Sequence, residues 1–550
     1  MQIRTNHRLL SRVERICNNN NKKEMMPQSG IINVRGVSFR YPDAAQPALK
    51  EVNLTVNRGD RILVIGHNGS GKSTLLSLLA GRRMPHTGSV RVLNGDPFDD
   101  TSMAQHIALI GAPWPPEAVF GNTVGRVAAP APLPERKAAV AEALHLRLSR
   151  FVDKMSSGEK RRVQILHGLL RPATVYLLDE CSTDIDLAER RTVLDLVKRE
   201  CEEREGCCLY ATHILDRIQG WATHLLLFEN GEIVELRPVT ELQIPLEEYA
   251  FQFMSQCATR DDVSGHVKLS YGKFSPTSTL APLVEGSSAA AVMPSSPTLP
   301  IHDNRTYWRS AETAVSSQRE VVIDCSHLSY KDIFRDMSFQ VFRGERVLLC
   351  GVNGAGKTTL LNMLGGKQFF DNGNGALSVL GKRCYEDMLL NGLVSYGGDW
   401  WTVVPGGEMH VHQLLQIKTA RAEHLRSLLA VQMDWDVRHI SAGEQKRVQL
   451  LFHLLEDNPI VLLDEATADL DVDQRHSLLQ FLYEESTQRG VTVVYSTHIF
   501  GGLEGWASTA VLLDRTARGV HAVYRELPGA PLALNDLIDE IVALKAKEVF

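Results

Sequence analysis

From Ile31 onward, the chain contains short runs of mainly apolar residues, a pattern typical of strands. The runs IINVRGVSF, VNLTV and RILVIG have the length and the β-branched content of strands. Helix-like and strand-like segments then follow one another up to about residue 240, and order resumes near Arg319 with VVIDCSHLSY. Strands that alternate with helices predict an α/β fold.

The second half of the chain repeats the first at a constant offset of 285 positions. A constant offset across about 150 residues indicates a nearly gapless duplication. We therefore predict one cassette over residues 31–260 and another over residues 319–550. The matched pairs are Lys72 and Lys357, Ser156 and Ser441, Glu180 and Glu465, His213 and His498, and Trp221 and Trp506.

Two segments fall outside the repeat. Residues 1–30 carry six Lys and Arg against two Glu and include a run of four asparagines, which predicts a disordered basic tail. A mitochondrial presequence is the alternative interpretation of this start. Residues 261–318 hold five prolines and eleven serines, a composition that predicts a flexible linker.

Composition narrows the class of protein. With 550 residues, 44% hydrophobic and 23% charged, the chain resembles an ordinary globular protein with two or more domains. A net charge of −6 gives no general attraction for nucleic acid or for an anionic membrane. No apolar run approaches the roughly 18 residues of a membrane-spanning helix. The nine scattered cysteines predict buried thiols in a reducing compartment, so we expect a cytoplasmic protein, with the nucleus as an alternative.

Two glycine-rich stretches carry the first chemistry, GHNGSGKST at Gly66–Thr74 and GVNGAGKTT at Gly351–Thr359. Each follows a strand-like run and opens a helix, the context that a phosphate-binding loop requires. Their backbone N–H groups surround phosphates, the lysine reaches the outer phosphates, and the next hydroxyl binds Mg²⁺. The predicted ATP-binding residues are Gly66, Asn68, Gly69, Gly71, Lys72, Ser73 and Thr74, and in the second copy Gly351, Asn353, Gly354, Gly356, Lys357, Thr358 and Thr359.

Downstream of each loop, a buried strand ends in two acids, in VYLLDE (Val175–Glu180) and IVLLDE (Ile460–Glu465). The first acids, Asp179 and Asp464, are predicted to bind Mg²⁺ through water, together with Ser73 and Thr358. The second acids, Glu180 and Glu465, are predicted to orient and polarise the attacking water.

The stretches MSSGEK (Met155–Lys160) and ISAGEQ (Ile440–Gln445) precede these strands and resemble the LSGGQ signature of ABC ATPases. That resemblance implies a RecA-like α/β core, an antiparallel β subdomain and a helical signature subdomain in each cassette, the last at about residues 115–165 and 401–450. It also implies that the two cassettes of one monomeric chain close head to tail. The signature of each would then complete the other's ATP site through Ser156, Gly158, Ser441 and Gly443.

The same resemblance assigns further residues. His213 in YATHIL and His498 in YSTHIF end strands, as does the ABC switch histidine that contacts the γ-phosphate. Asp186 and Asp471 match the D-loop aspartate. Tyr41 in SFRYP resembles the ring on which the adenine stacks; Tyr330 is the second candidate, although an ungapped comparison places it opposite Phe39.

One departure from the transporter pattern narrows the family. Transporters carry a glutamine after the strand that follows the glycine loop, whereas ALIGAPW and VSYGGDW carry Trp114 and Trp400 instead. With THILDRIQGWAT (Thr212–Thr223) and THIFGGLEGWAS (Thr497–Ser508), this resembles the soluble ABC ATPases of the CCR–NOT-associated (Caf) type and of plant class I. Members of that group usually carry a single cassette.

We therefore expect a twin-cassette ATPase that uses two ATP·Mg²⁺ to switch a protein complex, such as a CCR–NOT-like complex, without binding nucleic acid directly. Both copies keep the full catalytic set, so two competent sites are predicted. The first alternative is the energising subunit of a transporter with separate membrane proteins. The second is a ribosome-associated factor, disfavoured because the linker holds only four Lys and Arg against five Asp and Glu and is interrupted by proline.

Overall fold

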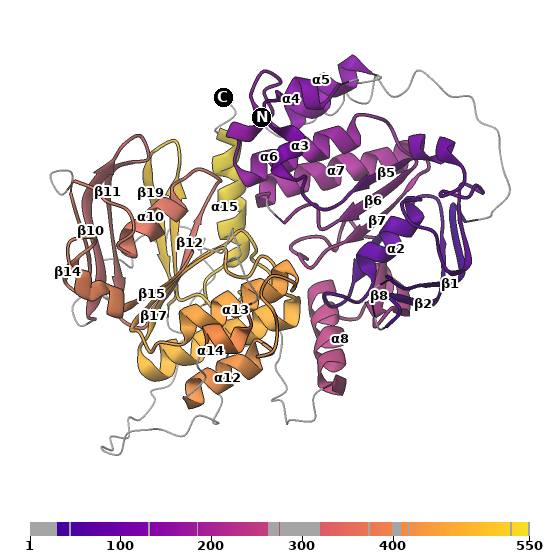
Figure 1. Ribbon diagram of the computed structural model, residues 1–550. Helices are drawn as coiled ribbons and strands as arrows, with labels where there is room; N and C mark the ends of the chain where they lie inside the picture. The colour runs from indigo at the N-terminus through magenta and orange to yellow at the C-terminus, as the bar shows by residue number, and fades with distance from the viewer. Residues whose placement is uncertain are drawn as a thin grey trace, which may run out of the picture. The chain divides into compact units, whose positions relative to one another are not determined.

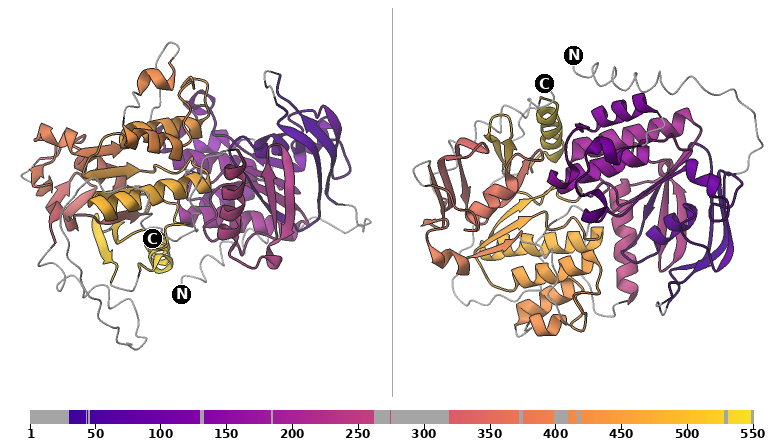
Figure 2. Two further views of the ribbon diagram at one scale, coloured as in Figure 1. Left: turned by 90° about the horizontal axis from the view of Figure 1, so that it is seen from below. Right: turned by 45° about the horizontal axis from the view of Figure 1, so that its top comes forward.

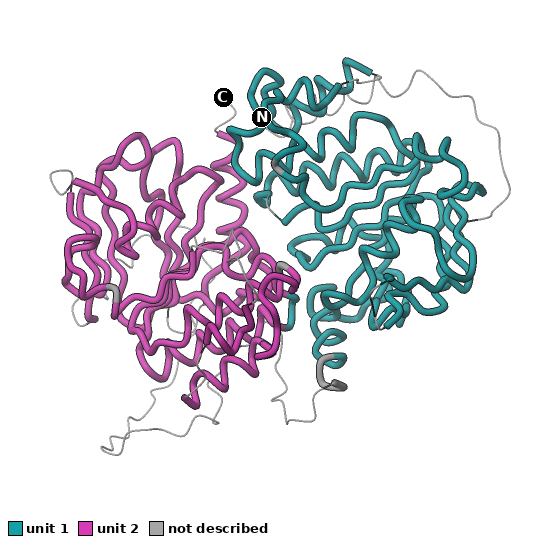
Figure 3. Tube along the Cα trace, in the orientation of Figure 1, with its two compact units in different colours: residues 1–266, 471–473 teal, residues 267–470, 474–550 magenta. Residues whose placement is uncertain are grey.

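The computed structural model describes residues 30–261, 274 and 319–547, apart from 43, 45, 130–132, 184, 372–374, 399–408, 416–418 and 528–530. The predicted tail up to residue 29 lies outside the described residues. So do Trp400 and the predicted linker, except Asp261 and Phe274. Two compact units make up the chain, one of residues 1–266 and 471–473 and the other of residues 267–470 and 474–550 (Figure 3).

A six-stranded sheet forms the centre of the first unit, in the order β5-β6-β7-β3-β8-β9 (Figure 1). All its neighbouring strands run parallel except β8 and β9, which are antiparallel. The inner strands are apolar almost throughout, because both faces of a parallel sheet are covered. The strands are β3 (Arg61–Ile65), β5 (Ile107–Ile110), β6 (Val175–Asp179), β7 (Cys207–Ala211), β8 (His224–Glu229) and β9 (Glu232–Pro238).

A smaller antiparallel sheet has the order β2-β1-β4. Its strands are β1 (Ile32–Phe39), β2 (Leu49–Val56) and β4 (Thr87–Val92). The apolar core joins the two sheets through α2 (Lys72–Leu79), whose Leu75, Leu76 and Leu79 are fully buried. The helix that follows the first glycine loop is therefore fixed from two sides.

The other helices of the first unit fall into two groups. The short helices α3 to α5 lie at the opposite end of the unit from β1 and β2 (Figure 2). The long helices α6 and α7 lie along the central sheet (Figure 1). The elements are α3 (Pro116–Val119), α4 (Val124–Val127), α5 (Pro134–Ala143), α6 (Ser157–Leu169), α7 (Leu187–Glu203), α8 (Leu246–Asp261), and the 3-10 turns η1 (Thr101–Gln105), η2 (Val152–Lys154) and η3 (Val239–Glu241).

The second unit has the same two-sheet design, with orders β15-β16-β17-β12-β18-β19 and β11-β10-β13-β14. Its strands are β10 (Val321–Tyr330), β11 (Phe334–Phe342), β12 (Arg346–Gly351), β13 (Ala376–Val379), β14 (Lys382–Arg383), β15 (Val394–Gly397), β16 (Ile460–Asp464), β17 (Thr492–Ser496), β18 (Thr509–Asp514) and β19 (Gly519–Arg525). Its helices are α10 (Lys357–Leu364), η6 (Met388–Gly392), α11 (Val411–Leu414), α12 (Ala420–Leu428), α13 (Ala442–Leu454), α14 (Val472–Arg489) and α15 (Leu534–Lys547).

The predicted α/β fold class, two P-loop domains that each carry an antiparallel sheet and a helical segment, is confirmed. The 285-residue offset also holds in three dimensions: α6 and α13, β6 and β16, and β7 and β17 begin and end at equivalent residues. No described helix is long and apolar enough to cross a membrane. The eight cysteines in the described part of the chain are buried, as predicted.

Candidate functional site

The first glycine loop connects β3 to α2 and leaves no room for a side chain at Gly66 or Gly71. A Cβ on Gly66 would lie 2.0 Å from the Phe228 carbonyl oxygen, and a Cβ on Gly71 would lie 2.5 Å from that of Ala48. Gly71 also has a φ of 111°, which side chains disfavour. These glycines therefore keep the backbone N–H groups of the loop exposed toward a bound phosphate.

The second loop, between β12 and α10, is built in the same way. Gly351 has a φ of 147° and a Cβ there would lie 2.7 Å from the Leu513 carbonyl oxygen. A Cβ on Gly356 would lie 2.7 Å from the ring of Phe334. The two loops thus share one backbone design, although their neighbours differ.

The loop lysines are buried and bonded to the loops themselves. Lys72 Nζ donates to the carbonyl oxygens of Gly66 at 2.6 Å and His67 at 2.8 Å. Lys357 Nζ donates to those of Gly351 at 2.8 Å and Val352 at 3.3 Å. Each ammonium group is therefore held at the centre of its loop, where a phosphate would lie.

A hydroxyl and a carboxylate meet beside each loop. Ser73 Oγ lies 2.9 Å from Asp179 Oδ1, and Asp464 accepts from Ser496 Oγ at 2.6 Å and from Thr358. Burial raises the pKa of both aspartates, although these hydrogen bonds act in the opposite direction. A divalent cation would offset the cost of burying each carboxylate.

These pairs fit Mg²⁺, which takes one or two carboxylates, keeps several waters and accepts phosphate oxygens. Within the described ranges, no three His, Cys, Asp or Glu side chains gather into an all-protein metal cage. The remaining ligands of a cation here would therefore come from the nucleotide and from water.

The next acid faces the histidine in both units. His213 Nδ1 lies 2.9 Å from Glu180 Oε2, and His498 Nδ1 lies 2.8 Å from Glu465 Oε2. Burial alone would raise the pKa of each glutamate, but the charge and hydrogen bond of the histidine keep it below its usual value. Each glutamate is thus ionised at neutral pH and oriented by the histidine.

Both glutamates also have an unusual backbone. Glu180 and Glu465 each have a φ of 49°, in the left-handed region that non-glycine residues rarely adopt. Their N–H groups donate to the carbonyl oxygens of Ala211 and Ser496, at the ends of β7 and β17. Each glutamate is the first residue after its strand, β6 or β16.

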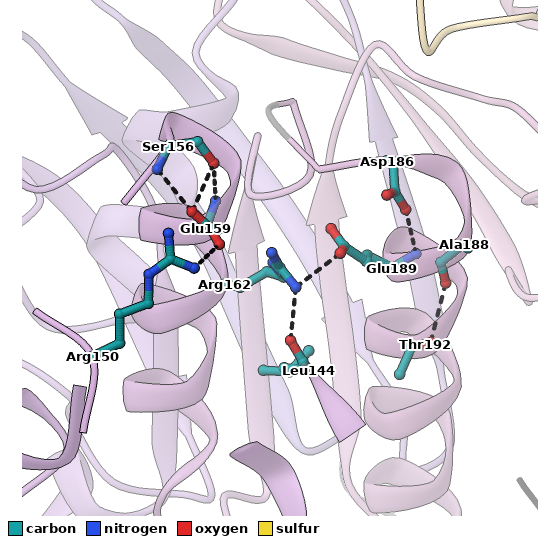
Figure 4. Close-up of polar contacts among 9 residues, drawn as sticks. All are labelled: Leu144, Arg150, Ser156, Glu159, Arg162, Asp186, Ala188, Glu189 and Thr192. Atoms are coloured by element: carbon teal, nitrogen blue, oxygen red, sulfur yellow. Dashed lines mark hydrogen bonds and ion pairs between the residues drawn. The ribbon is translucent and has the colours of Figure 1, made fainter. Parts of the chain in front are cut away.

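The signature serines form helix caps. Ser156 Oγ accepts from the N–H of Glu159 at the start of α6, and Glu159 accepts from the N–H of Ser156 in return (Figure 4). Ser441 and Glu444 form the same capping box on α13. The described contacts of the serines are therefore those of a cap, and their predicted role at a phosphate stays a prediction, as does that of Gly158 and Gly443.

The D-loop aspartates differ in their contacts. Asp186 Oδ1 accepts from the N–H of Glu189 at 2.9 Å and caps α7 (Figure 4). Asp471 belongs to the first compact unit, where its carboxylate accepts from the N–H of Asn68 in the glycine loop at 3.1 Å.

The candidate base-stacking residues also differ. The Tyr41 hydroxyl lies 3.1 Å from Thr74 Oγ1 on α2, so its ring stands beside the first glycine loop. Tyr330 instead pairs with Phe334, as Phe39 pairs with Leu49 in the first unit. Tyr330 thus has the same register position in its sheet as Phe39, in agreement with the ungapped sequence comparison.

Two side chains that the sequence does not single out, Arg161 and Gln164, bind the segment after β5, where the transporter pattern has a glutamine. Arg161 on α6 donates to the carbonyl oxygens of Gly111 at 2.7 Å, Glu180 at 2.6 Å and Cys181 at 3.0 Å. Gln164 donates to the Ala112 carbonyl oxygen at 2.7 Å. The predicted tryptophan, Trp114, instead packs edge-to-face on His167 with ring centres 5.3 Å apart. In the sequence, Arg161 and Gln164 are marked only by their place in the basic stretch RRVQIL.

The tryptophans of the repeated closing element have structural contacts. Trp221 Nε1 donates to the Leu194 carbonyl oxygen at 2.8 Å, and Trp506 Nε1 donates to that of Leu479 at 2.9 Å. Each indole also packs edge-to-face on a buried tyrosine with ring centres 6.0 Å apart. They attach α7 and α14 to the central sheets.

Comparison with known proteins agrees with this geometry. A family model described as "ABC transporter" matches residues 49–183 and 334–468. ABC transporter I family member 21 of Arabidopsis thaliana is 36% identical over 225 residues, 38% of this chain and 79% of that protein. CCR4-associated factor 16 of Saccharomyces cerevisiae is 30% identical over 223 residues, 37% of this chain and 77% of that protein.

A solved structure matches almost the whole chain. The archaeal ribosome recycling factor aABCE1, in complex with the ribosomal stalk protein aP1, has a TM-score of 0.62 at 20% identity and covers 92% of each chain. This likeness concerns the fold. ABC cassettes bind and hydrolyse ATP, and both units here contain the loop, the acids and the histidine. The chain belongs to the ABC ATPase family, and it contains two cassettes of that family.

Proposed function

We propose that this ATPase hydrolyses ATP·Mg²⁺ at both cassettes and uses the cycle to remodel a macromolecular complex. The observation that carries the proposal is the Glu–His pair beside each glycine loop, at 2.9 and 2.8 Å. Each pair holds an ionised carboxylate where the water that attacks the γ-phosphate would stand. Neither copy lacks a residue of this set, which supports two competent sites.

Each remaining predicted residue has a role in the proposal. Lys72 and Lys357 neutralise the outer phosphates, while the Ser73–Asp179 and Thr358–Asp464 pairs hold Mg²⁺. The family resemblance implies that the signature residues of one cassette complete the site of the other: Ser441 and Gly443 for the first site, Ser156 and Gly158 for the second.

The catalytic part is tested with Glu180→Gln and Glu465→Gln. Glutamine keeps the size of the side chain but cannot accept a proton, so each variant should lose its own site's turnover by at least about 100-fold while ATP binding persists. The double variant should then show about 1% of the wild-type phosphate release. If either single variant left turnover unchanged in a chain whose other site is inactive, that glutamate would have no catalytic role.

For the partner, we propose a ribosomal complex as the first candidate. The chain shares a two-cassette fold with the ribosome recycling factor over 92% of its length. The CCR–NOT-like complex expected from the sequence rests on relatives that align with about one cassette, such as the yeast factor at 37% of this chain. It is therefore the second candidate.

One purification separates these candidates. The tagged Glu180→Gln/Glu465→Gln chain would be isolated from its own cells with ATP and its companions identified by mass spectrometry. The Lys72→Ala/Lys357→Ala chain, which should not bind ATP, is the matched control. Ribosomal proteins enriched over this control support the first candidate, and deadenylase subunits would replace it with the second. A polytopic membrane protein at matching amounts would overturn both in favour of a transporter.

A further inference from the structure

The two cassettes differ in the turn that carries the predicted base-stacking ring. In the first unit, β1 and β2 are joined by nine residues, 40–48, which include Tyr41. In the second unit, β10 and β11 are joined by only three, residues 331–333. The second turn is thus too short to contain an equivalent of Tyr41.

Tyr330 does not fill this place. It is the last residue of β10 and has the register position of Phe39 on β1, two residues before the place of Tyr41. Among the described residues, no aromatic ring therefore has the position beside the second glycine loop that Tyr41 has beside the first.

A neighbouring turn is longer in the second unit. Asn230 and Gly231 alone join β8 to β9, whereas four residues, Arg515 to Arg518, join β18 to β19. The longer turn is fixed against the shortened one, because the Arg518 carbonyl oxygen accepts from the N–H of Arg335 at 2.7 Å. Arg518 also forms an ion pair with Asp332 at 3.0 Å.

The longer turn places a guanidinium group against the glycine loop. Cζ, Nη1 and Nε of Arg515 lie 3.6, 3.6 and 3.7 Å from the point where a Cβ of Gly354 would be. Three nearly equal distances mean that the flat face of the group covers Gly354. The residue is exposed to solvent. Gly69, the equivalent glycine, has nothing within 4 Å of that point.

We propose that Arg515 is the base-binding residue of the second ATP site, where its guanidinium stacks on the adenine in place of a tyrosine ring. Guanidinium groups are planar and stack on aromatic systems, which a lysine ammonium cannot do. The chain would then hold its two nucleotides by different means, with a ring at the first site and a cation at the second. This inference rests on the proposed function of the second loop as an ATP site.

The test measures the two sites separately in the full chain. The photoreactive probe 8-azido-ATP is crosslinked with Mg²⁺ in the cold, and labelled peptides are assigned to residues 31–260 or 319–550. Unlabelled ATP then competes over a range of concentrations. Arg515→Ala should raise the half-competing ATP concentration at the second site about fivefold and leave the first site unchanged.

Four further variants test the nature of the contact. Arg515→Lys keeps the charge but loses the planar group, so it should behave like Arg515→Ala, whereas Arg515→Tyr should restore wild-type competition. Thr516→Ala is the control within the same turn and should have no effect. Tyr41→Ala should weaken the first site alone.

The outcomes separate this inference from the function on which it rests. If ATP competes at neither site in the wild-type chain, the proposed ATP sites themselves are wrong. If ATP competes at both sites and Arg515→Ala changes nothing, stacking by Arg515 is wrong. If ATP competed with Arg515→Lys as it does with the wild-type chain, the stacking proposal would also be wrong. The positive charge alone would then suffice, and the residue would bind a phosphate rather than the base.

Discussion

Arg161 connects the signature helix to the catalytic glutamate, and its replacement by methionine should affect both stability and turnover. The side chain is 3% exposed and donates to three backbone carbonyl oxygens and, at 2.6 Å, to Gln164 Oε1. Two of the carbonyl oxygens keep another donor in the variant: the Gly111 oxygen keeps Gln164 at 3.3 Å, and the Glu180 oxygen keeps Thr183 at 2.6 Å. The Cys181 carbonyl oxygen and Gln164 Oε1 each lose the donor described for them.

The expected loss of stability follows from the number of hydrogen bonds that the variant loses or weakens. Two unsatisfied buried oxygens cost about 2–6 kcal/mol together, and two weakened hydrogen bonds add about 1 kcal/mol in total. Removal of a buried charge offsets part of this sum. We therefore expect Arg161→Met to lower the free energy of unfolding of the first unit by about 3–5 kcal/mol.

Turnover should fall for a separate reason, because Arg161 holds the peptide group of Glu180 itself. A small displacement of this carboxylate should lower kcat about tenfold, about 1.4 kcal/mol, while KM for ATP stays unchanged. The assay is phosphate release by a chain that also carries Glu465→Gln, so that only the first site turns over. Arg161→Lys should recover much of kcat, because the second copy has Lys446 at the same position.

Arg136→Met is the matched control. It breaks a buried ion pair with Glu200 in the same unit and should cost similar stability, yet leave kcat intact below the unfolding temperature. The reasoning is refuted if Arg161→Met keeps the wild-type kcat, or if Arg136→Met lowers kcat equally. A higher KM at constant kcat would instead assign Arg161 to ATP binding.

Two further predictions concern stability. Trp506→Phe keeps the ring packing but loses the hydrogen bond to the Leu479 carbonyl oxygen, so the free energy that protects the amides of α14 from hydrogen exchange should fall by about 1–2 kcal/mol. Trp221→Phe should have the same effect on α7. An effect in one unit alone would contradict the structural equivalence of the two tryptophans. Burial lowers the pKa of Lys446 from 10.5 to about 8 in the folded state. The unfolded chain thus binds more protons between these values, and the second unit should gain at most about 3 kcal/mol in stability as pH rises from 8 to 10.5. Urea unfolding at both pH values measures this gain, which should vanish in Lys446→Met.

The sequence predicted the elements whose cause is local. Four apolar residues before two acids make β6 and β16 recognisable, because a buried parallel strand must be apolar on both faces. The loop glycines were predictable because their backbone conformation excludes side chains. The constant offset then transferred each assignment from one cassette to the other.

Other features depend on contacts that leave no local signal. The acceptors of Arg161 are backbone carbonyls on separate segments, and any residue type supplies a carbonyl. Likewise, the register of Tyr330 shows only when β10 and β11 are paired, and the place of Arg515 only when two turns are compared across the units.

The left-handed backbone at Glu180 and Glu465 has an evolutionary consequence. A φ of 49° costs a side-chain-bearing residue about 1 kcal/mol relative to glycine, so a Glu→Gly change at either position would relieve strain and abolish hydrolysis together. A duplicated cassette released from selection would gain stability by that route. The two copies have diverged at Arg161 and Lys446, yet both retain the costly glutamate. That retention is what the proposal of two competent ATP sites predicts.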